Sequence, residues 1–336
     1  MTYFITGVAG FVGSQLARTL IAEGHRVVGV DNLSGGFIDN VPPEVEFHQV
    51  DCDDREAMST IMRKSGVDVV FHAACTAHEG LSVFSPYFIT HNTFDITASV
   101  LSAAVEQKVK RFVYMSSMAR YGSQGSHPFV ETMQPKPQDP YAIAKYASEL
   151  LVRETCETHG IEYAIAIPHN IIGPGQNFTD PYRNVVSIWI NLMLQGKDCY
   201  IYGDGEQKRC FSFISDVVDP LLRLAHDPAA NGEAFNIGPD TNVTTINEMF
   251  KITAELVGYH NDAIYIPERP REVRESHCSA DKARRMLGYE PKKELREGVQ
   301  EMIDYIKKHG PKPFVYNHPV EIDSPMLPET WKKKLF

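Results

Sequence analysis

The stretch TYFITGVAGFVG, residues 2–13, decides the fold of this chain of 336 residues. Residues 3–6 are expected to form a strand, and residues 14–23 have the pattern of an amphipathic helix that stops at Gly24. Between them stand three glycines spaced three residues apart, Gly7, Gly10 and Gly13. Glycines in such a turn allow a tight bend and let the backbone approach a pyrophosphate, whose charge rests on the helix N-terminus. The stretch therefore predicts a dinucleotide site, although its spacing differs by one residue from G-x-G-x-x-G.

The same alternation of strand and helix patterns continues as far as Pro168. We expect further strands over residues 26–30, 45–50, 67–72, 111–115 and 163–167, and helices over residues 56–65, 94–107 and 141–158. Such a rhythm is typical of α/β proteins in which helices cover both faces of a parallel sheet. It predicts a doubly wound, Rossmann-type domain over residues 1–168.

The pattern loosens after Pro168, where turns rich in Gly and Pro become frequent. Helical patterns remain near residues 185–194, 216–225, 246–257 and 280–287. We expect a smaller, mixed α/β lobe over residues 169–336 that contributes side chains to a cleft, with some segments returning to the first domain. The end, residues 310–336, contains five prolines and is expected to form an irregular strap over the surface.

The composition excludes several classes of function. A net charge of -10 disfavours nucleic acid as a partner, because binding a phosphate backbone needs a basic footprint. No apolar stretch is long enough to cross a membrane, and a strand begins almost at once, without a targeting segment before it. The six cysteines are scattered, and no His, Cys and carboxylate residues have metal-ligand spacing. We therefore expect a cytoplasmic protein with reduced thiols and no metal site.

An acidic residue at the end of the second expected strand indicates which dinucleotide is bound. A carboxylate at Asp31 would accept hydrogen bonds from the adenosine ribose hydroxyls and repel a 2′-phosphate, which favours NAD over NADP. Asp51, at the end of the third strand, is placed to meet the adenine. Its alternative interpretation is a solvated loop carboxylate in an acidic run with Asp53 and Asp54.

A candidate catalytic pair follows Asp139, which suits a helix N-cap, and Pro140, which suits the first helical position. Tyr141 and Lys145 are then four residues apart on one helix face. A tyrosine has a pKa of about 10, and an ammonium 4–5 Å away supplies roughly 3–4 kcal/mol toward lowering it. With a positive nicotinamide ring nearby, the pair could serve as a general base. A hydroxyl at Ser117 could orient a substrate alcohol.

Together these features resemble the extended short-chain dehydrogenase/reductases, and within them the NAD-dependent nucleotide-sugar epimerases and dehydratases similar to UDP-glucose 4-epimerases. The resemblance spans nearly the whole chain. Besides the glycine turn, it rests on Asp31, residues 71–74 (FHAA), Asn92, residues 116–122 (SSMARYG), residues 141–145 (YAIAK), residues 168–170 (PHN), residues 203–209 (GDGEQKR) and residues 269–272 (RPRE).

The resemblance implies a role for each of three groups of residues. The expected NAD site consists of Gly7, Gly10, Phe11, Val12, Gly13, Asp31, Asn32, Asp51, Cys52, Ala73, Ala74, Asn92, Ser116, Tyr141, Lys145 and Pro168. The expected catalytic residues are Ser117, Tyr141 and Lys145. The expected substrate contacts are Thr76, Ser117, Tyr141, Asn170, Arg209, Phe211, Arg269 and Glu272. Among these, Asn170, Arg209 and Arg269 would hold the diphosphate and Glu272 the nucleotide ribose. The family usually has Gly before that acid, whereas this chain has Arg271.

The family shares a first step, in which the tyrosine takes a proton from a sugar hydroxyl, usually at C4, while NAD takes the hydride. Dehydratases place an Asp-Glu pair after the catalytic hydroxyl residue, where this chain has Met118 and Ala119, which cannot transfer protons. The sequence therefore predicts an epimerase of a UDP- or GDP-linked sugar, acting at C4. The alternatives are a nucleotide-sugar 4-dehydrogenase or dehydratase, and a non-catalytic NAD-binding protein.

Two further expectations concern the substrate loop and the assembly. Residues 76–82 should face the sugar, where His78 or Glu79 either contacts hydroxyls or lies on the surface. The resemblance implies a homodimer formed by the helices near residues 94–107 and 141–158.

Overall fold

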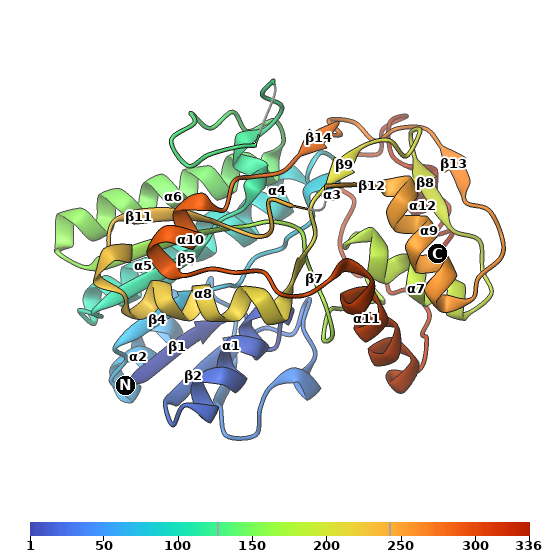
Figure 1. Ribbon diagram of the computed structural model, residues 1–336. Helices are drawn as coiled ribbons and strands as arrows, with labels where there is room; N and C mark the ends of the chain where they lie inside the picture. Colours follow the sequence, from blue (N-terminus) through green and yellow to red (C-terminus); the bar gives the residue numbers. More distant parts are fainter. Residues whose placement is uncertain (126–127, 242) are drawn as a thin grey trace.

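The computed structural model describes residues 1–125, 128–241 and 243–336 (Figure 1). Its centre is a parallel sheet of seven strands in the order β11-β6-β5-β4-β1-β2-β3. The strands are β1 (Thr2–Thr6), β2 (Arg26–Asp31), β3 (Glu46–Gln49), β4 (Val69–His72), β5 (Arg111–Met115), β6 (Glu162–Pro168) and β11 (Glu233–Ile237). The predicted doubly wound parallel sheet is thereby confirmed.

Helices cover both faces of this sheet, because alternate side chains of each strand point to opposite sides. On β1, Tyr3 and Ile5 enter one apolar core and Phe4 enters the other. The first core is closed by α1 (Phe11–Ala22), α8 (Ile214–His226) and α10 (Asp281–Leu287). The second is closed by α2 (Arg55–Ser65), α5 (Ile96–Glu106) and α6 (Pro140–His159).

The strand order reverses direction at β1, which lies between β2 and β4. In open α/β sheets a crevice forms beyond the carboxyl ends of the strands at such a switch point, because the two neighbouring connections leave on opposite faces. The glycine turn after β1 opens into this crevice, and so do the ends of β4 and β5. The fold alone therefore places the ligand site at the residues singled out in the sequence.

A smaller lobe stands at the carboxyl end of the sheet, on the right of Figure 1. Its apolar core gathers α7 (Val185–Leu194), α9 (Ile246–Val257) and α11 (Leu295–His309) around Trp189. Short strands line it: β7 (Ile171–Ile172), β8 (Tyr200–Tyr202), β9 (Lys208–Arg209), β10 (Ser212–Phe213), β12 (Thr244–Thr245), β13 (Ile264–Ile266) and β14 (Glu275–Ser276). The remaining short helices are η1 (Ile38–Asn40), α3 (Glu79–Ser82), α4 (Pro86–Thr90), η2 (His91–Asp95), η3 (Met118–Tyr121), η4 (Pro228–Ala230) and α12 (Glu329–Lys332).

Three elements from beyond residue 168 belong to the sheet and its cover. β11 pairs in parallel with β6, and α8 and α10 pack on the first core. The helix α11 was absent from the sequence-based expectation. The helices expected over residues 185–194 and 246–257 have those bounds in the structure.

The C-terminal segment, residues 310–336, lies against both halves of the chain. The Ser85 hydroxyl donates to the Pro319 carbonyl at 2.6 Å, and the Glu321 carboxylate accepts from the first amides of α4. At the other end Thr330 is hydrogen-bonded to Tyr202 of the small lobe. Trp331 is buried, so the segment contributes to an apolar cluster as well as crossing the surface.

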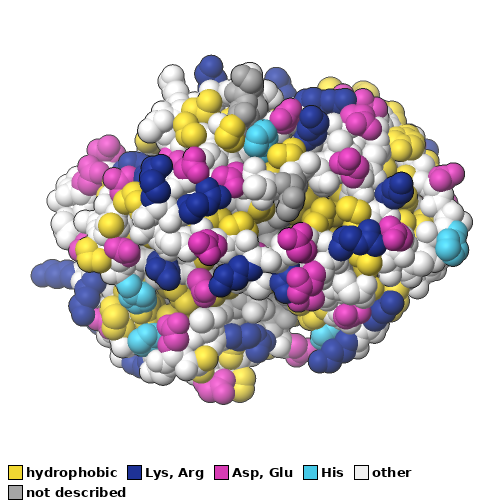
Figure 2. Space-filling model, viewed as in Figure 1, with side chains coloured by type: hydrophobic (Ala, Val, Ile, Leu, Met, Phe, Trp, Pro, Cys, Tyr) yellow, Lys and Arg dark blue, Asp and Glu magenta, His cyan; other side chains and the backbone are white. Residues whose placement is uncertain are grey.

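Charges of both signs are interspersed over the face shown in Figure 2, without a continuous basic area there. Among the described residues, no helix combines the length and the apolar character that crossing a membrane requires.

A chain of hydrogen bonds fixes His72 at the end of β4. The Ala74 amide donates to the Thr6 hydroxyl at 3.1 Å, which leaves that hydroxyl to donate to His72 Nδ1 at 2.8 Å. The Thr97 hydroxyl donates to a carbonyl one turn earlier, so it accepts from His72 Nε2 at 3.0 Å. These directions require the neutral ring with its proton on Nε2. Burial, with the charge of Lys145, lowers the pKa of His72 to about 3.

We expect the free energy of unfolding to fall as the pH is lowered from 7 to 5. The folded-state pKa of His72 lies below the unfolded value of about 6.5, so the unfolded chain binds the proton first, which costs about 2 kcal/mol at pH 5. Urea unfolding at pH 7, 6 and 5 measures this slope. It should be shallower in His72→Gln and unchanged in His260→Gln, whose side chain is exposed. Equal slopes in all three proteins would contradict the assignment.

Candidate active site

A cavity of about 480 Å³ lies between the sheet and the small lobe. It brings together every residue that the sequence analysis expected at a cofactor, catalytic or substrate site. These are Gly7, Gly10, Phe11, Val12, Gly13, Asp31, Asn32, Asp51, Cys52, Ala73, Ala74, Thr76, Asn92, Ser116, Ser117, Tyr141, Lys145, Pro168, Asn170, Arg209, Phe211, Arg269 and Glu272. Their individual roles remain predictions.

The glycine turn has no room for side chains. A Cβ on Gly13 would lie 2.2 Å from the Gly7 carbonyl oxygen, and a Cβ on Gly7 would lie 3.0 Å from the backbone of Ala74. Gly7 also has φ +69°, a conformation that favours glycine. Gly10 caps α1 without a side-chain hydrogen bond, so the first amides of the helix remain available to an anion. This geometry fits the pyrophosphate of a dinucleotide.

Asp31 supports the turn as well as facing the cavity. Its carboxylate accepts from the amide of Ala9 at 3.0 Å and from that of Leu33 at 2.7 Å. Burial raises the pKa of Asp31 although these backbone hydrogen bonds act to lower it. Nearby, Asn32 donates to the Asp51 carboxylate at 2.8 Å. Asn32, the residue after Asp31, thus contacts the second acid expected at the adenosine end. Asp31 also supports the turn, a role that its position in the sequence did not reveal.

The helix expected to begin at residue 94 is preceded by a wider turn, the π-helical η2. Inside it Asn92 has ψ 18°, and its carbonyl accepts from the Thr76 amide at 3.2 Å. Such turns add one residue to a helix and occur frequently at functional sites. Here the turn places Asn92 on the cavity wall and fixes the loop that begins at Thr76.

The expected catalytic residues meet at the start of α6. Asp139 caps the helix by accepting from the Ala142 amide at 2.9 Å, and Pro140 takes its first position, as the sequence predicts. The Ser117 hydroxyl lies near Tyr141 and acts to lower the pKa of its phenol. The Lys145 ammonium nitrogen lies 5.9 Å from the Tyr141 ring centroid and donates to the Met115 carbonyl at 2.7 Å. A phenol, a hydroxyl and a fixed cation therefore share one corner of the cavity.

The electrostatics of this pair without NAD show how strongly burial opposes ionisation of the tyrosine. Burial raises the pKa of Tyr141, and the opposing effects of Lys145 and Ser117 do not offset it. Lys145 stays charged, because Cys75 and the neighbouring tyrosines outweigh the effect of burial and raise its pKa. Lys145 alone is thus insufficient to ionise Tyr141 near neutral pH, since desolvation of a buried phenolate costs more than one ammonium returns.

A buried ion pair supports the end of β5 behind these residues. The Ser116 hydroxyl donates to Glu149, and the same carboxylate pairs with Arg120 at 2.6 Å. Both charged side chains are almost fully buried. The pair therefore holds Ser116 in place, and with it the neighbouring Ser117.

A second polar group lies at the small-lobe end of the cavity. Arg209 donates to one oxygen of Glu272 at 2.7 Å, and Arg269 donates to the other oxygen at 2.7 and 3.0 Å. Burial acts to raise the pKa of Glu272, but Arg269 and Arg209 outweigh it and leave the carboxyl ionised. The resemblance implied the two arginines at a diphosphate and the acid at a ribose. The pairing among the three is visible only in the structure.

The departure at Arg271 has a physical explanation. This residue has φ +63°, the left-handed region that glycine adopts without strain. The turn that presents Glu272 to the arginines therefore has, at Arg271, a backbone conformation that glycine would adopt more easily.

The other expected contacts complete the wall. The Asn170 amide donates to the Cys210 carbonyl at 3.1 Å, which fixes it beside Pro168 at the end of β6. Phe211 follows and is buried. Trp331 and Phe336 of the C-terminal segment also line the cavity and were not expected there. The sequence signal that could have indicated this was the presence of aromatic residues in a proline-rich tail.

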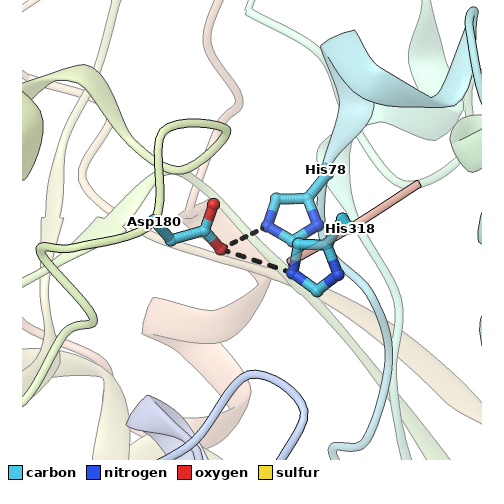
Figure 3. Close-up of side chains that lie close together, drawn as sticks. All are labelled: His78, Asp180 and His318. Carbon is cyan, nitrogen blue, oxygen red and sulfur yellow. Dashed lines mark hydrogen bonds and ion pairs between the residues drawn. The ribbon is translucent and has the colours of Figure 1, made fainter. Parts of the chain in front are cut away.

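His78 proves to be buried, which overturns the alternative that placed it on the surface. It donates from Nε2 to Asp180 at 2.7 Å, and His318 approaches the same carboxylate oxygen at 3.7 Å (Figure 3). Among the described residues these three could hold a metal ion, although sequence spacing did not bring them together. Arg183 also donates to that oxygen, at 3.3 Å, and a cation there opposes a metal. The group links the substrate loop to the C-terminal segment.

Comparison with known proteins agrees with this geometry. Residues 3–238 match the NAD dependent epimerase/dehydratase family. Over 315 residues the chain is 31% identical to UDP-glucose 4-epimerase of Mycolicibacterium smegmatis, a match that covers 91% of this chain and 99% of that protein.

Solved structures resemble the whole architecture. UDP-glucose 4-epimerase of Thermotoga maritima, with UDP-glucose, has a TM-score of 0.88 and 34% identity, covering 92% of this chain and 99% of that one. UDP-glucose 4-epimerase of Thermus thermophilus, in complex with NAD, has a TM-score of 0.86 and 28% identity, covering 91% and 99%. The chain therefore belongs to the NAD dependent epimerase/dehydratase family and is an enzyme of that family with NAD as its cofactor.

Proposed function

We propose that the chain is a nucleoside-diphosphate-sugar 4-epimerase. The observation that carries the proposal is the set of residues around Tyr141 and Ser117, which line the same cavity. The two positions after Ser117 are Met118, which is buried against the cavity wall, and Ala119. Neither side chain can transfer a proton, so Tyr141 is left to remove a proton from one hydroxyl and return it. That work suffices for epimerisation.

Each group of residues in the site has its own role in the proposed reaction. Ser117 and Tyr141 hold the sugar hydroxyl between them, and Tyr141 takes its proton. Lys145, fixed on the Met115 carbonyl, stabilises the phenolate and would contact the nicotinamide ribose when NAD is bound. The glycine turn, Asp31 and the residues grouped with them above would hold NAD, which when bound accepts the hydride from the sugar carbon and gives it back.

The small lobe supports the choice of substrate class. Arg209 and Arg269 present guanidinium groups suited to a diphosphate, at the end of the cavity away from the glycine turn. Relatives named as UDP-glucose 4-epimerases make UDP-linked hexoses the first substrates to test.

The test offers UDP-glucose to purified holoenzyme without added NAD. We expect UDP-galactose to form, as resolved by chromatography, without net NADH. Loss of the C6 hydroxyl as water would instead identify a dehydratase. In a parallel assay with excess NAD added as hydride acceptor, NADH growing beyond one equivalent per chain would identify a 4-dehydrogenase. Tyr141→Phe with no effect on any activity would favour a non-catalytic NAD-binding protein.

We also propose a homodimer formed through α6 and the neighbouring helices. Ile143 and Leu150 lie seven residues apart on α6 and are 52% and 44% exposed. Exposed apolar residues at helical spacing favour a partner helix. Sedimentation of a monomer at micromolar concentration would contradict this.

A further inference from the structure

Glu79 occupies a fixed place in the cavity, at the start of α3. The Ser82 hydroxyl donates to the Glu79 carbonyl at 2.6 Å and lies 3.2 Å from the Asp139 carboxylate. Asp139 caps the helix that carries Tyr141. The short helix is therefore tied to the corner of the cavity where the catalytic residues meet.

The other side of α3 faces the polar group of the small lobe. A Cβ on Gly80 would lie 3.2 Å from an Arg269 guanidinium nitrogen and 3.3 Å from Trp331. Glu79 thus stands between the corner that holds Tyr141 and the arginines expected at the diphosphate. When a nucleotide sugar binds, its sugar lies between the residues that hold the diphosphate and the residues that act on the reacting carbon.

Glu79 is an exposed residue and lines the cavity. In the part of the chain that the structure describes, it has no ion pair within 4.0 Å and no side-chain hydrogen bond. The two arginines near it are already shared by Glu272. Desolvation by the surrounding protein is the largest cause that raises the pKa of Glu79, to about 7, and the negative charges of Asp139 and Glu272 add to it. Arg209 and Arg269 act to lower this pKa but do not offset the increase.

We propose that Glu79 contacts the sugar and selects its charge, so that the site takes neutral hexoses and rejects hexuronic acids. This inference rests on the proposed function. A carboxylate accepts hydrogen bonds from sugar hydroxyls, and it repels a second carboxylate placed within the same enclosed cavity. Rejection by an unpaired like charge is an established means of specificity.

The test measures equilibrium binding at pH 8 by calorimetry, with UDP, UDP-glucose and UDP-glucuronate as ligands of the holoenzyme. We expect wild type to bind UDP-glucose at least about ten-fold more tightly than UDP-glucuronate. Glu79→Gln should bind UDP-glucuronate at least about ten-fold more tightly than wild type does, and UDP about equally well. Glu290→Gln, an exposed carboxylate outside the cavity, is the matched control and should behave as wild type.

The outcomes separate the inference from the proposed function. If Glu79→Gln keeps its NAD and its unfolding temperature but the ratio of the two dissociation constants is unchanged, the inference is overturned while nucleotide-sugar binding stands. If none of the three UDP compounds binds, the proposed function for UDP-sugars fails and the inference fails with it.

A pH series on wild type provides a second measurement that needs no variant. The groups facing Glu79 are Asp139, Arg209, Arg269 and Glu272, and His78, beside it in the chain, is kept neutral by burial, which lowers its pKa to about 4. The preference for UDP-glucose over UDP-glucuronate should therefore increase from pH 6 to pH 8, as Glu79 loses its proton. A ratio that is constant over this range overturns the inference.

Discussion

Replacing Tyr141 by Phe is expected to lower kcat about 10³-fold while the purified protein keeps its NAD. The variant loses only the phenolic oxygen, whose pKa both Lys145 and Ser117 act to lower. Without that oxygen the sugar hydroxyl loses the acceptor that stands beside Ser117 and Lys145, and Met118 and Ala119 offer no substitute there. Rates with UDP-glucose, NAD content after denaturation and the unfolding temperature measure the three parts of this prediction.

The matched control for this variant is Tyr146→Phe. Tyr146 stands on the same helix as Tyr141, five residues later, and does not line the cavity. Its replacement should leave kcat within about two-fold of wild type. If Tyr141→Phe retained more than a tenth of the wild-type rate, proton transfer by Tyr141 would be contradicted.

Gly13→Ala is expected to remove most of the bound NAD and to destabilise the fold by about 1–3 kcal/mol. The new methyl group would lie 2.2 Å from the Gly7 carbonyl oxygen and 3.0 Å from the α-carbon of Val8. Both are backbone atoms, so the strand end and the helix start must separate. The turn then no longer fits a pyrophosphate. NAD content per chain and urea unfolding measure the two effects.

Thr19→Ala on the same helix is the control. Its hydroxyl donates only to the Gln15 carbonyl, one turn earlier in the helix, and it lies outside the cavity. This variant should keep a full complement of NAD. A Gly13→Ala protein with wild-type NAD content would show that the glycine turn does not contact the cofactor.

The sequence predicts best what depends on neighbours in the chain. Three features depend on residues only a few positions apart, and their geometry follows from backbone rules. They are the β1–α1 turn, the helix cap at Asp139, and the placement of Tyr141 and Lys145 on one helix face. The resemblance extended this to Arg209 and Arg269. Each of these residues lines one cavity in the structure.

Long-range contacts could not be predicted in the same way. His78 and Asp180 are 102 residues apart, and nothing in either neighbourhood indicates the other. The sharing of Glu272 by Arg209 and Arg269 depends on how a loop turns at Arg271, which is a property of the folded backbone. The pKa of Tyr141 likewise depends on burial, which distance to Lys145 along a helix does not reveal.

The helix α11 is a different case, because its signal was present in the sequence. Val299, Met302, Ile303 and Ile306 are buried and have helical spacing. The strand β11 is shorter than α11, and its sequence did not indicate where it belongs. Its pairing with β6 shows that it extends the sheet of the first domain. The chain beyond residue 168 thus supplies one strand and two helices, α8 and α10, to the sheet and its cover.

The C-terminal segment has an implication for how substrate range can change. Residues 310–336 add His318, Trp331 and Phe336 to the cavity wall, yet they pair with no strand of the sheet among the residues described. Sequence variation in this tail can accordingly remodel part of the cavity wall without touching Tyr141, Lys145 or the glycine turn. Libraries confined to this segment offer a direct route to variants with altered substrate preference on an unchanged catalytic scaffold.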